Sequence, residues 1–235
     1  MIGKGKSISH GVAALEYDLA KEIDGQAAAT EIARHELYGC TGAEMVQEMK
    51  PYHIDFPNVK NNCLRFEVSP SIEESATFTD ADWAELGNDF MQRMGLANHQ
   101  YIIIRHSGTE SKKEQAHLHI LANRVSLSGE LYRDNWIGKK ATEAANAIAK
   151  ERNFVQSQDI GKVNKAEIKE AMDGVLKKMQ GFDLTKFKEE LGKRGFKVRE
   201  ARASTGKLNG YYVTARSGTE LSLIHISEPT RRSYI

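Results

Sequence analysis

Tyr101-Ile102-Ile103-Ile104-Arg105 and Ala116-His117-Leu118-His119-Ile120-Leu121-Ala122-Asn123 are the two stretches that decide the fold. β-Branched, aromatic and aliphatic side chains dominate both stretches, which favours extended strands. The segment between them, residues 107–115, is polar and is expected to be a loop. Two strands joined by one loop predict an antiparallel hairpin. Hairpin-connected strands in turn predict an α+β fold, in which helices cover an antiparallel sheet.

The flanking residues predict the other elements. A capping box at Thr79 and Asp82 begins a helix that is expected to end near Gly95. The remaining helices are expected over residues 10–23, 27–36, 41–49, 139–152, 164–179 and 184–193. Further strands are expected over residues 63–68 and 131–133, and in a C-terminal hairpin of residues 196–203 and 209–215. In the first helix, helical spacing predicts a core-facing stripe of Val12, Leu15, Leu19 and Ile23.

The central hairpin gathers three histidines at one end. Because alternate residues of a strand share a face, His117 and His119 point the same way, with Cα atoms roughly 6.5–7 Å apart. His106 ends the preceding strand, so pairing of the two strands brings it beside His117. Three neutral imidazoles with open coordination positions suit a divalent metal ion that acts as a Lewis acid. The alternative is a structural His-x-His pair that binds no metal.

Two more side chains are assigned to the same site. Asn123 lies on the strand face of His117 and His119, where it is a candidate to hold a ligand or a DNA phosphate. Glu67 is the candidate catalytic carboxylate that supports a metal ligand, because it lies near the end of the strand expected over 63–68. An exposed strand residue is the alternative interpretation of Glu67.

The candidate nucleophile is Tyr17 on the first predicted helix. At roughly 100° per residue it lies about 200° from Leu15, so it faces away from the core stripe. A phenol can attack a metal-held phosphate, but its ordinary pKa of about 10 means that it needs help from the metal or a nearby cation. Lys21 follows one turn later. Packing against another element is the alternative role for Tyr17, and two other tyrosines compete as nucleophiles, Tyr38 and Tyr52.

The bulk composition is ordinary for a soluble globular protein. The chain has 235 residues, of which 40% are hydrophobic and 28% charged. No apolar run is long enough to span a membrane, and residues 1–6 lack the apolar core of a signal peptide. We therefore expect a cytoplasmic protein without membrane insertion. Cys40 and Cys63 form no metal-type spacing and are expected to be free thiols.

The net charge of +1 gives no support to nucleic-acid binding, but the charge is unevenly distributed. Residues 186–207 contain eight basic and three acidic side chains, which is a local net charge of +5. Such a run either contacts phosphates or forms a solvated charged surface, and the sequence leaves both open.

Three segments together resemble the relaxase/mobilization nucleases, which are HUH endonucleases named for two histidines that flank one hydrophobic residue. The three are Gly11-Val12-Ala13-Ala14-Leu15-Glu16-Tyr17-Asp18-Leu19, His99-Gln100-Tyr101-Ile102-Ile103-Ile104-Arg105-His106 and His117-Leu118-His119-Ile120-Leu121-Ala122-Asn123. The resemblance runs to about Asn153 and continues more weakly from Phe182 to Thr219. It implies a sheet of about five antiparallel strands, with Tyr17 as nucleophile and His106, His117 and His119 as metal ligands. Asn123 matches the asparagine of the family.

The chain departs from the family pattern around the metal ligands. Gly108 and Ala116 stand where many members have an aspartate and a proline, and Cys63 replaces a frequent histidine. The loop between the two strands is also longer. Glu110 in that loop is a candidate replacement for the missing aspartate.

The resemblance implies a DNA relaxase that nicks one strand at an origin of transfer, for mobilization of a plasmid or another mobile element. Tyr17 would form a 5′-phosphotyrosine link with help from Mg²⁺ or Mn²⁺. The expected partners are single-stranded DNA, accessory mobilization proteins and a coupling protein. The candidate DNA contacts are Lys4, Lys6, Arg105, Lys112, Lys113, Asn123 and Arg124.

Other function classes remain. A rolling-circle replication initiator shares the chemistry, although the position of Tyr17 before the histidines favours the relaxase order. A DNA-binding accessory protein with structural histidines is the non-enzymatic alternative. A hydrolase of small molecules is disfavoured, because the sequence has no compact acid–base pair and no Gly-rich phosphate loop.

The sequence predicts three regions along the chain. Residues 1–153 are expected to form the nuclease domain, with HUH-like architecture, and residues 154–220 a helical linker with a small αββ appendage. Residues 221–235 form a tail whose first eleven residues resemble the translation of a sequencing adapter. We therefore exclude the tail from functional reasoning. On this interpretation the natural protein continues differently after Glu220 and is longer.

Overall fold

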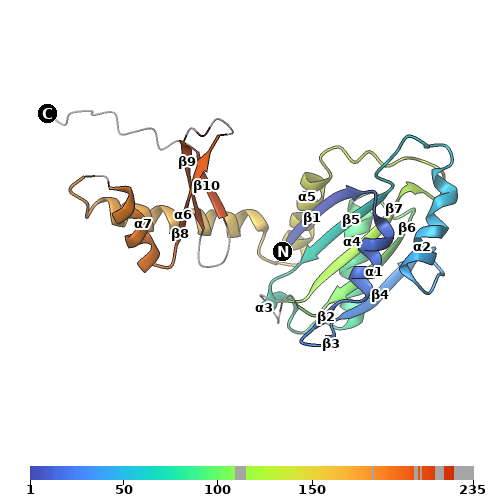
Figure 1. Cartoon of the computed structure of the whole chain (residues 1–235). Helices are drawn as coiled ribbons and strands as arrows, with labels where there is room; N and C mark the ends of the chain where they lie inside the picture. Colours follow the sequence, from blue (N-terminus) through green and yellow to red (C-terminus); the bar gives the residue numbers. More distant parts are fainter. Residues whose placement is uncertain (109–114, 182, 204–205, 207, 215–219, 225–235) are drawn as a thin grey trace. The chain divides into compact units, whose positions relative to one another are not determined.

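The computed structural model describes the chain except residues 109–114, 182, 204–205, 207, 215–219 and 225–235 (Figure 1). Lys112 and Lys113, two predicted DNA contacts, therefore lie outside the described residues, as does Glu110. The chain divides into two compact units, Met1–Ser157 and Gln158–Ile235.

The first unit is built on one five-stranded sheet with the strand order β1-β5-β7-β6-β4. Its strands are β1 (Ile2–Ile8), β4 (Ala29–His35), β5 (Cys63–Ser69), β6 (His99–His106) and β7 (His117–Ser126). All neighbouring pairs are antiparallel. The predicted hairpin, β6 with β7, lies inside the sheet, where β5 and β4 flank it. The structure thus confirms the α+β class and the five-stranded antiparallel sheet.

Helices cover both faces of this sheet (Figure 1). They are α1 (Gly11–Leu19), α2 (Gly42–Met49), the short 3₁₀ helix η1 (Lys50–His53), α3 (Ile72–Ser75), α4 (Asp80–Arg93) and α5 (Ile137–Glu151). Two-residue strands, β2 (Glu22–Ile23) and β3 (Gln26–Ala27), pair with each other. The predicted capping box at Thr79 starts α4, and an equivalent box at Thr41 starts α2.

Alternation along the strands separates two hydrophobic cores. Ile104 and Leu121 point to the face of α1 and α2, where they pack with Leu15 and Met45. Ile103 and Ile120 point to the opposite face and pack with residues of α4 and α5. The histidines share the α1 face with the first of these cores, because His117 and His119 are in step with Leu121.

α5 lies close against the edge strand β1. A Cβ atom added to Gly3 would lie 2.4 Å from the carbonyl oxygen of Ala141, so only glycine allows this approach. Lys4 and Lys6 lie on the face of β1 that points away from α5. These two side chains are therefore on the same sheet face as the histidines.

The structure corrects several sequence predictions. Residues 27–36 were expected to be helical, but Ala29–His35 form the edge strand β4. An edge strand has unpaired backbone groups along one side, and its side chains are often polar. In β4 a register shift between Glu31 and Ala33 also interrupts the alternation of side chains. The sequence of β4 therefore shows only a weak strand pattern. β1, rich in glycine and lysine, was missed for a similar reason. The strand expected over 131–133 is reduced to one bridge between Leu131 and Val125.

The first helix also differs from its prediction. α1 ends at Leu19 rather than continuing to residue 23. Its buried positions are Gly11, Ala14, Leu15 and Asp18, whereas Val12 is 39% exposed. The buried stripe is therefore rotated by about one residue from the hydrophobic one, because Asp18 and not Val12 points towards the sheet.

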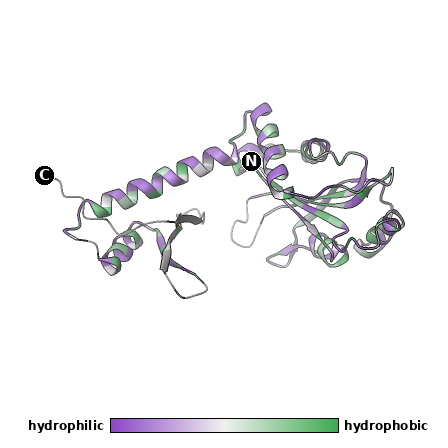
Figure 2. Ribbon diagram, turned by 90° about the horizontal axis from the view of Figure 1, so that it is seen from above, coloured by the Kyte–Doolittle hydropathy of each residue, from purple (hydrophilic) through white to green (hydrophobic). Residues whose placement is uncertain are grey.

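The second unit has two helices and a small sheet with its own core. Its elements are α6 (Ser157–Leu176), α7 (Leu184–Lys193), β8 (Lys197–Arg202), β9 (Leu208–Thr214) and β10 (Glu220–Ile224), and its strand order is β10-β9-β8. Phe187 and Leu191 of α7 pack with Ile168 of α6 and Val213 of β9. Figure 2 shows hydrophilic residues over most of α6, interrupted by hydrophobic positions. β10 includes residues 221–224 of the predicted non-native tail and pairs with β9.

In the part of the chain that the structure describes, no helix combines the length and the apolar character needed to cross a bilayer.

Candidate metal centre

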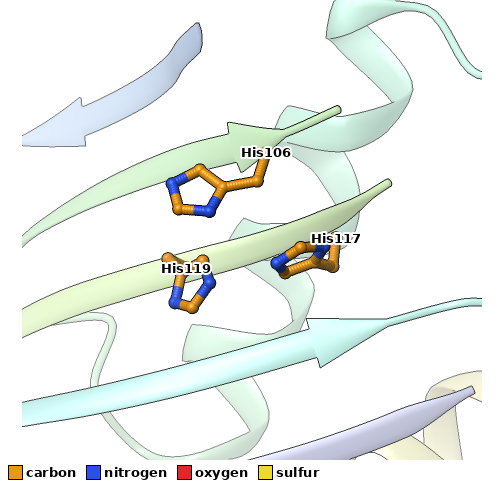
Figure 3. Close-up of side chains that lie close together, drawn as sticks. All are labelled: His106, His117 and His119. Atoms are coloured by element: carbon orange, nitrogen blue, oxygen red, sulfur yellow. The ribbon is translucent and has the colours of Figure 1, made fainter. Parts of the chain in front are cut away.

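The three predicted histidines converge at one end of the central hairpin (Figure 3). His106 ends β6 and pairs directly with His117, the first residue of β7. His119 follows two residues later on the same face. One ring nitrogen from each histidine lies within 4.8 Å of the other two. His106 and His117 are buried, at 2% and 6% exposure, and His119 is half-buried.

Backbone carbonyl groups orient two of the three rings. The Nδ1 atom of His117 donates to the carbonyl oxygen of Gln115 at 3.1 Å, and Nε2 of His106 donates to that of Asp18 at 2.8 Å. Each neutral ring therefore keeps its other nitrogen as a lone-pair donor. Metal-binding histidines ordinarily have such a second hydrogen bond, which fixes the ring and its tautomer.

A buried ion pair holds the third ring. Asp18 is 1% exposed, and its carboxylate accepts two hydrogen bonds from Arg65, at 3.0 Å and 2.5 Å. Arg65 also donates to Nδ1 of His119 at 3.2 Å. Asp18 thus contacts His106 through its backbone and reaches His119 through Arg65. The sequence analysis missed both residues; the available signal was a charged residue at an inward-facing position of α1.

Burial favours the neutral form of two of the three histidines, His106 and His119. Burial lowers the pKa of His106, against the opposing effect of its hydrogen bond to Asp18. Burial, followed by the charges of His106 and Arg65, lowers the pKa of His119 to about 2. Neutral imidazole is the form that binds metal ions, so the three side chains fit a divalent cation with coordination positions left open.

The lowered pKa of His119 predicts how the metal-free protein responds to acid. In the unfolded chain this residue takes up a proton near pH 6.5, but in the folded chain it does not do so until about pH 2. Stability should therefore fall as the pH drops below 6.5, by about 1.4 kcal/mol per pH unit from this residue. By pH 5 this amounts to about 2 kcal/mol.

Urea unfolding in EDTA at several pH values tests this prediction, with His119→Gln as the matched variant. Glutamine can still accept the hydrogen bond from Arg65 but does not titrate. We expect the stability of the wild type to fall more steeply with acid than that of the variant. Parallel curves would contradict a depressed His119 pKa.

Tyr17 lies on the exposed side of α1, as predicted, and is 60% exposed. Tyr17 immediately precedes Asp18, the residue that is hydrogen-bonded to His106 and, through Arg65, connected to His119. The Nζ atom of Lys21 lies 5.6 Å from the centre of the Tyr17 ring. The competing Tyr38 is also exposed, but its hydroxyl donates to Glu36, which raises its pKa. A raised pKa makes Tyr38 a poorer nucleophile than an ordinary phenol.

A shallow groove adjoins His119 on the sheet face. It has a volume of about 190 Å³ and is lined in part by Lys4, Lys6, Arg65 and Glu67. Glu67 pairs with His119 in one direction and with Lys4 in the other, so the three share one row across the sheet. Lys4 and Glu67 form an ion pair of 2.9 Å. The structure therefore brings Glu67 and two predicted DNA contacts to the histidine site.

Two other predicted DNA contacts do not belong to this surface. Arg105 points to the opposite sheet face and pairs with Asp80 of α4 at 2.5 Å. Arg124 is similarly turned away, pairing with Asp134 and binding two backbone carbonyl groups. Strand alternation places both side chains on the sheet face opposite the histidines, so the structure does not bring these two predicted DNA contacts to the histidine site.

Asn123 shares the face of the histidines but is inaccessible to DNA. It is fully buried, and its amide group donates to Gln100 and to the backbone of Met49. Its oxygen lies 2.6 Å from Nε2 of His53. η1 covers this end of the strand, which the sequence pattern of β7 could not reveal. Asn123 therefore organises a buried polar network in place of the predicted contact with an ion or phosphate.

The sheet presents a His-x-His pair beside a third histidine, which is the arrangement that the resemblance to HUH endonucleases predicted. The model of the relaxase family described as MobA/VirD2-like, nuclease domain, matches residues 17–154, which include Tyr17 and all three histidines. This match spans more than half of the chain. The protein belongs to the MobA/VirD2-like relaxase family and contains its nuclease domain.

Solved structures of the conjugative relaxase TrwC in complex with oriT DNA are similar to this chain. The metal-bound complex is 12% identical over 88% of this chain and 74% of the other, with a TM-score of 0.39. The metal-free complex is 10% identical over the same shares, also with a TM-score of 0.39. The copper-bound complex is 13% identical over 88% and 75%, with a TM-score of 0.38. Comparison with curated proteins gives no match.

Proposed function

We propose that this relaxase nicks single-stranded DNA at an origin of transfer, through attack by Tyr17, and mobilizes a plasmid or another mobile element. The observation that carries the proposal is the contact between the two halves of the site. Asp18, next to Tyr17, binds His106 directly and His119 through Arg65. Hydrogen bonds thereby connect the helix that carries the proposed nucleophile to the candidate metal ligands.

His106, His117 and His119 would hold Mg²⁺ or Mn²⁺. When bound, the ion would neutralise charge on the oxygens of the scissile phosphate. Lys4 and Lys6, in the groove beside His119, would contact neighbouring phosphates. Glu67 would support His119 from the adjacent strand, as the catalytic carboxylate.

Tyr17 would attack phosphorus in line with the leaving 3′ oxygen. The new bond joins the phenolic oxygen to phosphorus, and the bond between phosphorus and the 3′ oxygen breaks. The phenolic proton leaves to water, which reaches the exposed Tyr17 side chain. The 3′ oxygen takes up a proton from water. Because a phosphodiester replaces a phosphodiester, the reverse reaction can rejoin the strand without a nucleotide triphosphate.

Capture of covalent adducts tests this function. The full chain is incubated with Mn²⁺ or Mg²⁺ and a pool of single-stranded oligonucleotides of random sequence, then denatured in detergent. We expect protein bound to DNA through a 5′-phosphotyrosine, and the captured DNA should share one cleavage sequence. If metal-dependent adducts fail to form with either ion while DNA still binds, a DNA-binding accessory protein becomes the better description.

The partners beyond DNA follow from the same proposal. A relaxase bound to one cleaved strand requires accessory mobilization proteins that expose the origin and a coupling protein that delivers the complex. These partners are inferred from the activity.

A further inference from the structure

The two compact units have opposite net charges. Residues 1–157 contain 17 basic and 22 acidic side chains, a net charge of −5. Residues 158–214 contain 13 basic and eight acidic side chains, a net charge of +5. Because these two charges cancel, the net charge of the whole chain is only +1. An acidic nuclease unit attracts DNA only through local patches, whereas the basic unit attracts phosphate as a whole.

The basic unit presents a sheet face that carries two exposed basic side chains of β8. Val198 of β8 pairs with Val213 of β9, and both belong to the core beneath α6 and α7. Because side chains alternate, the neighbouring pair of Arg199 and Tyr212 points away from the helices. Lys197, two residues before Arg199, is exposed on this outward face. We name Lys197, Arg199 and Tyr212 the outer face of the β8–β9 hairpin.

Arg199 and Tyr212 form one stacked unit. The guanidinium carbon of Arg199 lies 4.3 Å from the centre of the Tyr212 ring. Planar guanidinium groups and aromatic rings are the surfaces on which unpaired bases stack, and the positive charge binds the phosphates between them. The bases of a duplex are already stacked on one another, so this combination favours a single strand.

The acidic residue of β8 does not oppose this charge. Glu200 points to the helix side of the sheet, where it accepts a hydrogen bond from Lys188 at 3.2 Å and is paired with Arg202 at 2.7 Å. Its carboxylate is thus compensated by two cations.

On the basis of the DNA nicking proposed above, we propose that the outer face of the β8–β9 hairpin is a second binding site for single-stranded DNA. Lys197 and Arg199 contact phosphates, and the Arg199–Tyr212 stack supports a base. The site holds a length of the substrate strand outside the nuclease unit, and this binding needs neither the histidines nor Tyr17.

Fluorescence anisotropy with labelled oligothymidylate tests the site in EDTA, where nicking does not occur. Lys197→Ser/Arg199→Ser in the full chain should weaken binding about tenfold at moderate salt. It should also reduce the slope of log affinity against log salt by about 1.4, which corresponds to two lost phosphate contacts on a single strand. Tyr212→Leu keeps an apolar side chain and should weaken binding at least about fivefold with an unchanged salt slope.

The matched control is Lys165→Ser/Lys169→Ser, which removes the same charge from exposed positions of α6. It should change the affinity less than about twofold. Thermal melting checks that each variant remains folded. The charge reversal Lys197→Glu/Arg199→Glu, at two exposed positions, provides a second variant that leaves the core unchanged.

Three results would overturn the second site: an equal loss in the α6 control, full affinity after Lys197→Glu/Arg199→Glu, or tighter binding of duplex than of single-stranded DNA. The Tyr17→Phe variant separates this site from the nicking reaction. This variant should bind oligothymidylate normally. A variant that loses adducts but keeps binding therefore reports on the nicking reaction and not on the second site.

Discussion

Replacing His117 and His119 together by alanine should abolish metal binding at the site and reduce adduct formation on the order of a thousandfold or more. The three ring nitrogens that converge within 4.8 Å are then reduced to one, which cannot hold a divalent ion. The ion would contribute several kcal/mol of charge stabilisation at the phosphate, and each 1.4 kcal/mol corresponds to a factor of ten. Titration calorimetry with Mn²⁺ measures the binding, and the adduct assay measures the reaction.

The control for this variant is His10→Ala. His10 is exposed and lies before the first turn of α1, at the opposite end of the helix from Asp18. We expect it to bind Mn²⁺ and form adducts like the wild type. Because His117 is buried, His117→Asn/His119→Asn should be tested as well, since asparagine fills more of the space than alanine. Normal Mn²⁺ affinity in either double variant would remove the histidines from the metal site.

Replacing Tyr17 by phenylalanine should eliminate the covalent adduct while metal and DNA binding remain. The change removes one oxygen atom from a side chain that is 60% exposed, so neither the fold nor the histidine cluster depends on it. Without the hydroxyl there is no atom to form the bond to phosphorus. Detergent-resistant adducts should fall below detection, and the affinity for Mn²⁺ should be unchanged.

Tyr38→Phe is the matched control, because it removes the same oxygen from another exposed tyrosine. It should form adducts at the rate of the wild type. If Tyr17→Phe still forms adducts and Tyr38→Phe does not, the nucleophile has been assigned to the wrong residue. The metal site and the family assignment would be unaffected by that outcome.

The sequence predicted the centre of the sheet better than its edges. β6 and β7 are covered by helices on both faces, so nearly every residue in them is buried and each strand contains a recognisable apolar run. β1 and β4 lie at the two edges, where each has one strand neighbour. Edge strands tolerate glycine, lysine and glutamate, and such sequences have no clear period. The missed strands are therefore those whose residues are least constrained by burial.

The residues of the site divide in the same way into those predictable from local sequence and those that depend on contacts between distant segments. The convergence of His106, His117 and His119 needs only one hairpin register and the alternation of a strand, and both are local properties. The position of Tyr17 away from the core needed only the geometry of one helix. The ion pair of Asp18 and Arg65 joins α1 to β5, and the row of Lys4, Glu67 and His119 joins three strands. Such contacts depend on strand order.

The sequence by itself determined the α+β class, the histidine cluster and the exposed tyrosine, because each of these arises within one element or between two adjacent ones. Only the tertiary structure decided which charged side chains reach that cluster. Lys4 and Arg65 reach it from strands that are distant in the chain. Arg105 and Arg124 face the other side, which follows already from alternation along β6 and β7. The physical reason is that a sheet brings together residues of different strands according to strand order, which the sequence of a single strand does not encode.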